Sequence, residues 1–135
     1  MTEFTLTAEI PGVEEYRTLR VEAGLSAKSK LASERGLAGS LFAVCIRNDD
    51  TLIGMGRIIG DGGLNYEVVD MAVHPDFQRQ GLGYRIMESL MEYIRSNAPE
   101  SSFVCLIADH GAPALYKKFG FEPTAPVSVG MALRL

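Results

Sequence analysis

The sequence predicts an α/β (α+β) fold in which one central sheet carries helices on both faces. Some segments repeat their apolar residues at helical spacing and others alternate apolar and polar residues, as strands do. The two kinds of segment follow neither a strict β-α-β order nor an all-β order. The length of 135 residues is that of one ordinary domain able to bury a core, so we expect a single domain over residues 1–135.

The first third of the chain predicts one strand and two helices. Thr5 to Ile10 alternates apolar and polar residues and ends at Pro11-Gly12, which is typical of a strand closed by a turn. Val13 to Ala23 has apolar residues at helical spacing and two acidic residues in its first turn. A second helix is expected from about Ser29 to Leu37.

The middle of the chain predicts a meander of three antiparallel strands. Leu41 to Arg47 and Leu52 to Ile59 flank an Asn-Asp-Asp turn and should form a hairpin. Gly54 and Gly56 in the second strand indicate a close approach by another backbone or a ligand. Tyr66 to Val73 supplies the third strand after an Asp-Gly-Gly turn.

The last third predicts a crossover helix, a buried strand and a terminal pair of strands. Gly83 to about Ser96 has one apolar face. Phe103 to Ala108 is wholly apolar and follows that helix, so it should be a buried strand parallel to Tyr66–Val73. A short helix over Ala112 to Phe119 should precede strands from Phe121 onward, including Val127 to Leu133.

Composition excludes several function classes. The net charge of -4 argues against nucleic acid as the main partner and is compatible with a cationic one. Cys45 and Cys105 lie in apolar runs and are expected to be core thiols. The N-terminus has no leader pattern and no apolar run could span a bilayer, so we expect a cytoplasmic protein without a membrane partner. No residue pattern implies a metal.

The stretch from Val69 to Tyr84 has the outline of a phosphate cradle. An apolar strand ends at a proline, a polar loop follows, and a helix is entered through Gly81 and Gly83. Unpaired amides and the helix dipole at such an entrance favour an anion. Position 86 is Ile rather than a third glycine, so the dinucleotide fingerprint fails, and the Walker sequence is absent. The alternative is a polar connection whose glycines have no ligand role.

Two motifs at the proper separation resemble the GNAT superfamily of acyl-CoA-dependent N-acetyltransferases. The first is Gln78 to Gly83 after Ala72-Val73-His74-Pro75, and the second is Ala112 to Phe121, which contains Leu-Tyr-Lys-Lys-Phe-Gly-Phe. The order of elements covers essentially the whole chain. This resemblance implies a mixed, mostly antiparallel central sheet with a splayed parallel strand pair.

The resemblance also implies a site for acetyl-CoA. Backbone amides from Gln78 to Tyr84 would hold the pyrophosphate, and the strand backbone from Met71 to Val73 would pair with the pantetheine arm. Asp109 falls where many members carry an Asn, but a carboxylate has no N–H to donate. The cofactor-binding residues implied in this way are Met71, Ala72, Val73, Gln78, Arg79, Gln80, Gly81, Leu82, Gly83, Tyr84, Asp109, Tyr116 and Lys118.

Three residues are candidates for proton transfer. Tyr116 matches the family's general acid toward the departing thiolate, although it could simply pack beside Phe119. Glu67 lies at the position of the general base in a subset of the family. Asp70 is the next candidate and lies on the opposite face unless the strand bulges. An ordered water chain is the remaining alternative for the base. His74 and His110 are interpreted as polar residues at the ends of elements.

The sequence predicts only the chemical class of the acceptor and the general kind of partner. The predicted reaction is acetyl transfer to a primary amine by direct attack, because neither cysteine is placed to carry the acyl group. The acidic balance favours a small cationic amine over a peptide or protein lysine or N-terminus. A non-catalytic acyl-CoA-binding regulatory module is the alternative from another class. A homodimer is expected because homodimers are common in the family.

Overall fold

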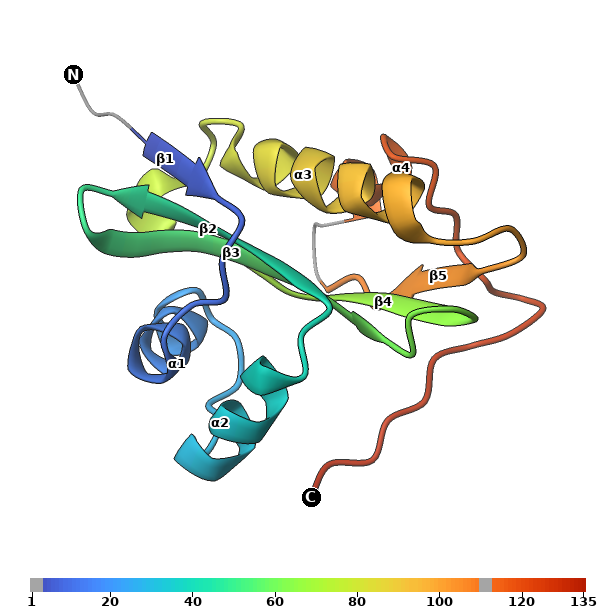
Figure 1. The fold of residues 1–135 in the computed structure, drawn as a ribbon, viewed down its shortest axis with the longest axis horizontal. Coiled ribbons are helices and arrows are strands. Elements are labelled where there is room, and N and C mark those ends of the chain that lie inside the picture. The colour runs from blue at the N-terminus through green and yellow to red at the C-terminus, as the bar shows by residue number, and fades with distance from the viewer. Residues whose placement is uncertain (1–3, 110–112) are drawn as a thin grey trace.

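The computed structural model describes residues 4–109 and 113–135. Within these residues one sheet separates two helical layers (Figure 1). The strands are β1 (Phe4–Thr7), β2 (Phe42–Asn48), β3 (Thr51–Gly60), β4 (Asn65–Val73) and β5 (Phe103–Leu106). The helices are α1 (Val13–Glu22), α2 (Lys30–Ala38), α3 (Leu82–Asn97) and α4 (Pro113–Lys117), with a 3-10 turn at Pro75–Phe77. Helices α1 and α2 lie on one face of the sheet, and α3 and α4 lie on the other.

Local sequence sets where the helices begin. The Gly12 N–H at the start of α1 donates to Glu15 Oε2 at 2.8 Å. At the start of α2, Ser29 Oγ accepts from the Ala32 N–H at 3.1 Å. Helix α3 begins directly after Gly81, as predicted. Its apolar face, which includes Ile86 and Leu90, is buried against the sheet.

The sheet has the strand order β1-β2-β3-β4-β5. Neighbouring strands are antiparallel except β4 and β5, which are parallel as the sequence predicted. That parallel register pairs only Asn65–Val68 with Phe103–Leu106. Val69 to Val73 therefore continue beyond the end of β5, which leaves one edge of β4 open. The splayed parallel pair implied by the resemblance is confirmed.

A bulge interrupts β4 beside this open edge. Arg57 of β3 pairs with Val69 and Met55 pairs with Ala72, so Asp70 and Met71 lie opposite the single residue Gly56. Asp70 has a φ of 57°. The extra residue turns Asp70 to the face of the sheet that carries α1 and α2, the face on which Val69 also lies. By alternation Glu67 is on that face as well, so the strand has the bulge that the sequence left open as the alternative, and Asp70 and Glu67 share a face.

The core lies on both faces of the sheet. One cluster packs the sheet against α3, and a second, with Tyr16, Leu19 and Leu37, packs it against α1 and α2. A Cβ added to Gly56 would lie 2.7 Å from Ile86 Cγ2 and 2.8 Å from Met71 Sδ. The sequence predicted that a backbone or a ligand would approach the glycines of β3, but at Gly56 the close neighbours are side chains of α3 and β4.

Three predictions about the elements are wrong. The first strand ends at Thr7 rather than Ile10. Phe103–Leu106 forms the predicted strand, but none of its four residues is buried because it lies at the edge of the sheet. Residues 121–135 contain no strand, so the terminal pair that includes Val127–Leu133 is absent from the folded sheet. The start of the helix predicted from Ala112, and His110, lie outside the described residues. In the described part of the chain, no helix is long and apolar enough to cross a membrane.

Candidate active site

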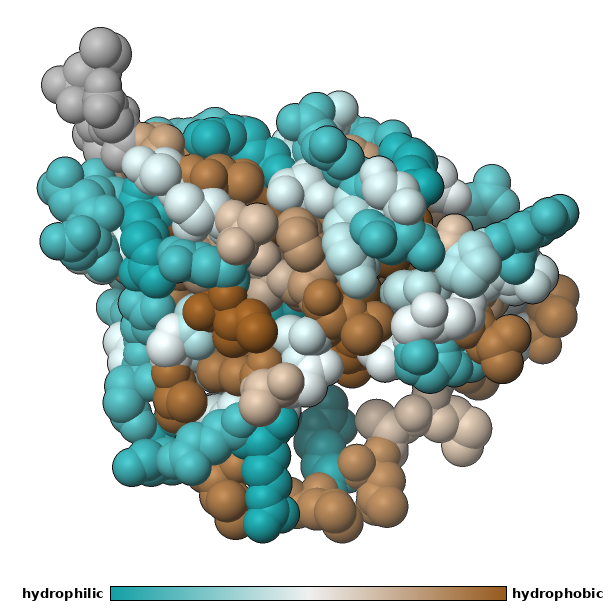
Figure 2. Space-filling model, viewed as in Figure 1, coloured by the Kyte–Doolittle hydropathy of each residue, from teal (hydrophilic) through white to brown (hydrophobic). Residues whose placement is uncertain are grey.

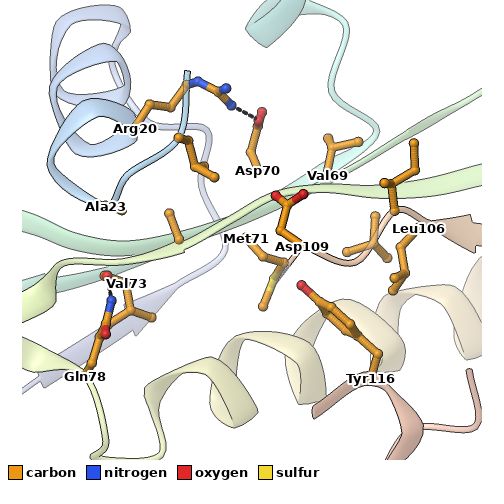
Figure 3. Close-up of a pocket in the computed structure, with 14 residues that line it drawn as sticks. Arg20, Ala23, Val69, Asp70, Met71, Val73, Gln78, Leu106, Asp109 and Tyr116 are labelled. Atoms are coloured by element: carbon orange, nitrogen blue, oxygen red, sulfur yellow. Dashed lines mark hydrogen bonds and ion pairs between the residues drawn. The ribbon is translucent and has the colours of Figure 1, made fainter. Parts of the chain in front are cut away.

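A cleft opens where β4 runs past the end of β5 (Figure 3). Its volume is about 390 Å³. The end of α1 forms one wall, and Tyr116 projects from α4 at the other side, with its hydroxyl directed toward Asp109. Residues Val68 to Val73 of β4 line the cleft between these walls. Its position beside an unpaired strand edge allows a ligand to hydrogen-bond to the backbone of β4.

A second cavity, of about 750 Å³, continues from the cleft toward the start of α3. The two cavities share Met71, Ala72 and Val73 of β4, together with Gln78 and Tyr116. At its far end this cavity is lined by the loop that includes Arg79, Gly81, Leu82 and Gly83. The strand edge and the glycine loop predicted from the sequence are thus brought together in one continuous hollow.

The start of α3 offers backbone donors to this hollow. Gly81 is the N-cap residue at φ 78°, and no side chain caps the helix. The first backbone hydrogen bond of the helix runs from the Arg85 N–H to the Gly81 carbonyl at 3.2 Å. The N–H groups before Arg85 therefore have no acceptor within the helix and can donate to a ligand. A Cβ at Gly83 would lie 3.4 Å from Leu115 Cδ2. An uncapped helix start with a wide cavity before it favours an anionic ligand such as a phosphate group.

The side chains of the loop contribute unequally. Gln78 Nε2 donates to the Val73 carbonyl at 3.0 Å, which ties the loop to the strand end. Arg79 and Gln80 are exposed, and Arg79 has a φ of 64°. Leu82 is 3% exposed and packs in the core, so only its backbone could contact a ligand. Tyr84, which is exposed, packs its ring on Phe119 at 4.9 Å between centroids.

Tyr116 is the phenol of the cleft. Tyr116 is 8% exposed and lines both the cleft and the second cavity. Burial, with a smaller contribution from the charge of Asp109, raises the pKa of the Tyr116 hydroxyl. The hydroxyl therefore keeps its proton at neutral pH and can donate it or hydrogen-bond to an anion. Lys118, two residues further along, is exposed and lies outside both cavity linings.

Asp70 is held by three donors from two elements. Its Oδ1 accepts from Arg20 Nη1 at 2.6 Å, and its Oδ2 accepts from Tyr16 Oη and from Arg57 Nε, both at 2.8 Å. The side chains of Asp70, Arg20 and Arg57 are 9%, 8% and 10% exposed. This buried cluster connects α1 to the bulge of β4, as the dashed contact in Figure 3 shows for Arg20.

Sequence reasoning missed this cluster. In the sequence, Leu19 and Arg20 fit the same position on the apolar stripe of α1, and Arg57 fits the lining of an acceptor cleft and a solvated hairpin equally well. The available signal was an arginine on an apolar helix stripe, because such a residue requires a buried acid. The nearest acid in the neighbouring strands could not be identified without the bulge.

Glu67 stands apart from the cleft. Its side chain is half-buried, and the linings of the two cavities do not include it. It raises the pKa of the neighbouring Cys105 thiol, although burial of that thiol is the larger cause. His74 directly follows β4, and its ring is held by two contacts: Nδ1 accepts from the Asp76 N–H at 3.1 Å, and Nε2 lies 3.2 Å from Glu22 Oε2.

A third cavity, of about 310 Å³, lies between α1, α2 and the sheet. It shares Val69 and Asp70 with the cleft, so it lies on the side away from the glycine loop. Lys28 and Arg57 are among its polar lining residues. Arg57 Nη1 donates to Ser40 Oγ at 2.7 Å and to the Gly36 carbonyl at 3.2 Å. The three cavities adjoin one another through shared lining residues, in order from the start of α3, past Tyr116 and the bulge, to α2.

The two cysteines are free thiols. Cys45 is buried, as predicted, and burial raises its pKa to about 12. Cys105 is half-buried and its pKa is also raised. Both thiols are therefore protonated at neutral pH and are poor nucleophiles. Among the described residues, no three His, Cys, Asp or Glu side chains are grouped closely enough to hold a metal ion.

Comparison with known proteins gives consistent family matches. The acetyltransferase (GNAT) domain family matches residues 38–123. The 1.7 Å crystal structure of a protein of unknown function from meticillin-resistant Staphylococcus aureus, described as a probable acetyltransferase, is 47% identical. It superposes with a TM-score of 0.95 and covers 98% of this chain and 100% of that chain. A GNAT-family acetyltransferase from Streptococcus pneumoniae TIGR4 shares the fold, with a TM-score of 0.80 at 23% identity and 98% coverage of each chain.

Two sequence relatives are named as N-acetyltransferases. The uncharacterized N-acetyltransferase ycf52 of Porphyra purpurea is 36% identical over 83 residues, which are 60% of this chain and 47% of that protein. The ycf52 protein of Pyropia yezoensis is 37% identical over 70 residues, which are 52% of this chain and 39% of that protein. The chain thus matches about half or less of the length of these relatives.

Proposed function

The chain belongs to the GNAT acetyltransferase family, and on this basis we propose that it transfers an acetyl group from acetyl-CoA to a primary amine. The amine would attack the thioester directly in a ternary complex. The observation that carries this proposal is the row of adjoining cavities along the open edge of β4, with an anion-favouring helix start at one end and the protonated phenol of Tyr116 beside the strand edge.

The residues present fit acetyl-CoA along this path. The backbone amides at Gly81 to Tyr84 and the charge of Arg79 suit the pyrophosphate. The open edge of β4 from Met71 to Val73 suits the amides of the pantetheine arm. The Gln78 side chain already donates to the Val73 carbonyl. A pantetheine amide could bond that carbonyl only by displacing Gln78 or by sharing the acceptor with it. Asp109 lines the cleft as a charged acceptor and would not replace an asparagine donor.

Tyr116 would serve as the general acid. As the amine nitrogen bonds to the acetyl carbon, the carbon–sulfur bond breaks and the sulfur departs as a thiolate unless a proton reaches it. The raised pKa of Tyr116 keeps its proton available until that step. The two protonated thiols offer no covalent carrier, which supports direct attack over a two-step transfer through cysteine.

The base that removes the amine proton is proposed to be Glu67, acting through water. Its carboxylate is half-buried on the same face as the third cavity but does not line that cavity, so a water would have to bridge the distance. Asp70 is nearer to the cleft, yet its oxygens already accept from Tyr16, Arg20 and Arg57. We assign Asp70 a positioning role on this ground.

The acceptor is proposed to be a small molecule with one primary amine. The acidic net charge favours a cation, as the sequence indicated. The third cavity qualifies this preference, because Lys28 and Arg57 line it and Asp70 is neutralised by Arg20 and Arg57. An amine that carries a carbonyl or carboxylate near the nitrogen suits this lining better than a polyamine does. Because both cysteines are free thiols, we propose a reducing compartment such as the cytoplasm as the place of action.

Steady-state kinetics of Tyr116→Phe test the catalytic assignment. We expect kcat to fall about 100-fold or more, with little change in the KM for acetyl-CoA. Tyr93→Phe is the matched control, because that ring stacks on Phe42 away from the three cavities. Glu67→Gln should also lower kcat. Unchanged turnover in Tyr116→Phe would remove the general acid from the proposal.

The cradle is tested with two glycines of the same conformation. Gly81 has φ 78° and Gly62 has φ 80°, and neither has a heavy atom within 4 Å of an added Cβ. Alanine at either position brings about 1 kcal/mol of backbone strain. Calorimetry should show acetyl-CoA binding at least tenfold weaker in Gly81→Ala and unchanged in Gly62→Ala. Equal affinities in the two variants would place the pyrophosphate elsewhere.

A panel of amines with acetyl-CoA identifies the acceptor class. The panel contains amino acids, simple alkylamines, polyamines and a lysine peptide, and thiol release is the readout. Turnover with the peptide alone favours the alternative function, which is acetylation of a protein lysine or N-terminus. If acetyl-CoA binds but every amine is inert, the chain is better described as a non-catalytic acyl-CoA-binding module.

A further inference from the structure

The third cavity, between α1, α2 and the sheet, has a positive lining in a protein whose net charge is -4. Lys28 and Arg57 are cations, and Asp70 is the one acid among the described residues that line it. Asp70 also faces Arg20, which lies outside the lining, with 2.6 Å between Oδ1 and Nη1. Three cations therefore surround one carboxylate at this cavity, and Glu67 on the same face does not line it. Such a balance favours an anionic group in the ligand.

Arg57 has a donor group that the fold does not use. The residue is 8% exposed. Its Nε donates to Asp70, and its Nη1 donates to Ser40 Oγ and to the Gly36 carbonyl. Within the described residues no acceptor bonds its Nη2, although every fully buried side-chain nitrogen or oxygen there has a partner. The Nη2 group therefore contacts open space, and the third is the only one of the three cavities that Arg57 lines. A buried guanidinium with one unused nitrogen is a strong donor for a carboxylate.

Lys28 supplies a second positive charge to the same cavity. Its carbonyl accepts from Arg17 Nε at 2.9 Å, which ties the connection between α1 and α2 to α1. The lining also includes the apolar residues Leu37 and Ile59. The surface over α1 and α2, at the lower left in Figure 2, likewise carries both hydrophilic and hydrophobic residues. A carboxylate would thus meet two cations, and the hydrocarbon part of the ligand would rest on apolar side chains.

The size and the place of the cavity limit the ligand further. Its volume of about 310 Å³ is at the lower end of the range of about 300–1,000 Å³ for ligand pockets. It shares Val69 and Asp70 with the cleft into which Tyr116 projects. A ligand bound to Arg57 would reach the cleft across these two neighbouring residues, so its carboxylate and amine must lie close together. A peptide lysine has no carboxylate beside its amine, and a polyamine would bring a second cation to a positive lining.

We propose that the acceptor is an amino acid whose carboxylate binds Arg57 and Lys28 in the third cavity while its amine reaches the cleft. This inference deepens the proposed function and rests on it. The amine nitrogen bonds to the acetyl carbon as the carbon–sulfur bond breaks, the base takes one amine proton, and Tyr116 protonates the departing thiolate. The products are an N-acetyl amino acid and the coenzyme A thiol. The two cations also disfavour a protonated amine, so they favour the neutral form that attacks.

Steady-state kinetics with matched pairs of amines test the proposal. The pairs are alanine and leucine, each with its carboxamide, which has the same amine and side chain but no carboxylate. We expect kcat/KM to be at least about tenfold higher for the amino acid, mainly through KM. Lys28→Gln should reduce this ratio at least about threefold. Lys30→Gln is the matched control and should keep the wild-type ratio, because Lys30 lies outside the third cavity, with its side chain 70% exposed.

Calorimetry with the expected products gives a measurement that does not need turnover. In the presence of coenzyme A, N-acetylleucine should bind at least about tenfold more tightly than its carboxamide. Lys28→Gln should reduce this preference and Lys30→Gln should not. Arg57→Lys keeps a positive charge beside Asp70 but removes Nη2, so it should reduce the preference as well. If circular dichroism shows that Arg57→Lys does not fold, the two lysine variants decide.

The outcomes separate this inference from the proposed function. Turnover of amines with equal kcat/KM for amino acids and carboxamides overturns the carboxylate site and leaves acetyl transfer intact. A binding preference for N-acetylleucine without turnover of any amine keeps the carboxylate site and refutes the transfer. An equal loss of preference in Lys28→Gln and Lys30→Gln would assign the effect to general surface charge, which also overturns the site.

Discussion

Replacing Asp70 by asparagine should destabilise the fold strongly. The variant keeps the size of the side chain but removes the charge that two buried guanidinium groups share, those of Arg20 and Arg57. Asparagine also has one acceptor oxygen where the carboxylate has two, so its amide N–H group must face a donor. Breaking a buried ion pair by removing one partner costs about 3–5 kcal/mol, because a charge is left uncompensated. We expect a loss of this size from a total stability of about 5–15 kcal/mol.

Urea unfolding at pH 7, followed by circular dichroism, measures this loss. With an m-value of about 2 kcal/mol per molar, the midpoint should fall by roughly 2 M. Asp76→Asn is the control, since it makes the same chemical change in the loop after β4 where the side chain is 82% exposed. Its effect should be within about 0.5 kcal/mol. A loss below about 1 kcal/mol in Asp70→Asn would refute the view that this carboxylate anchors α1 to the sheet.

Other parts of the structure allow three further predictions. Gly56→Ala should lose about 1–3 kcal/mol in the same urea assay, because the new Cβ would lie 2.7 Å from a side chain of α3, whereas Gly36→Ala in α2 has open space and should gain up to about 1 kcal/mol. Hydrogen bonds from Arg47, which are the largest cause, lower the pKa of Glu15 in the folded state, so its contribution to stability is present above the unfolded pKa and is lost as the pH falls below about 4.5. Glu15→Gln should flatten the fall in stability in that acid range, and an unchanged acid slope would contradict the assignment. The buried thiol of Cys45, with a pKa of about 12, should resist a disulfide reagent at pH 8 in the native protein and react only on unfolding.

Elements with strong local signals could be predicted from the sequence. The apolar face of α3 and its start after Gly81 follow from spacing and from a glycine that can adopt positive φ. The parallel pairing of β5 follows from the crossover helix before it. The strand end, the glycine loop and Tyr116 also meet in one hollow, as two motifs at the right separation indicated.

Features that depend on contacts between distant segments could not be predicted. The terminal segment, residues 127–135, alternates apolar residues with mostly polar or small ones as a strand does but forms no strand, because the pattern does not say whether a sheet edge is available to it. The burial expected for β5 failed because β5 is the last strand of the sheet, and its position in the strand order is not written in its own residues. Likewise Tyr16, Arg20 and Arg57 come from α1 and β3 and meet only because β4 carries one extra residue.

The bulge in β4 links the fold to the chemistry of the cleft. In a regular strand Asp70 would point to the opposite face, where Ile86 and Leu90 pack, and burial of an unpaired carboxylate there would cost several kcal/mol. With the bulge, the carboxylate meets two arginines and Met71 takes the position against α3. The same irregularity lies at the point where β4 runs past β5 and its edge opens to the cleft. The acid at this position is therefore accounted for by folding, which is why the proposed reaction assigns removal of the amine proton to another group.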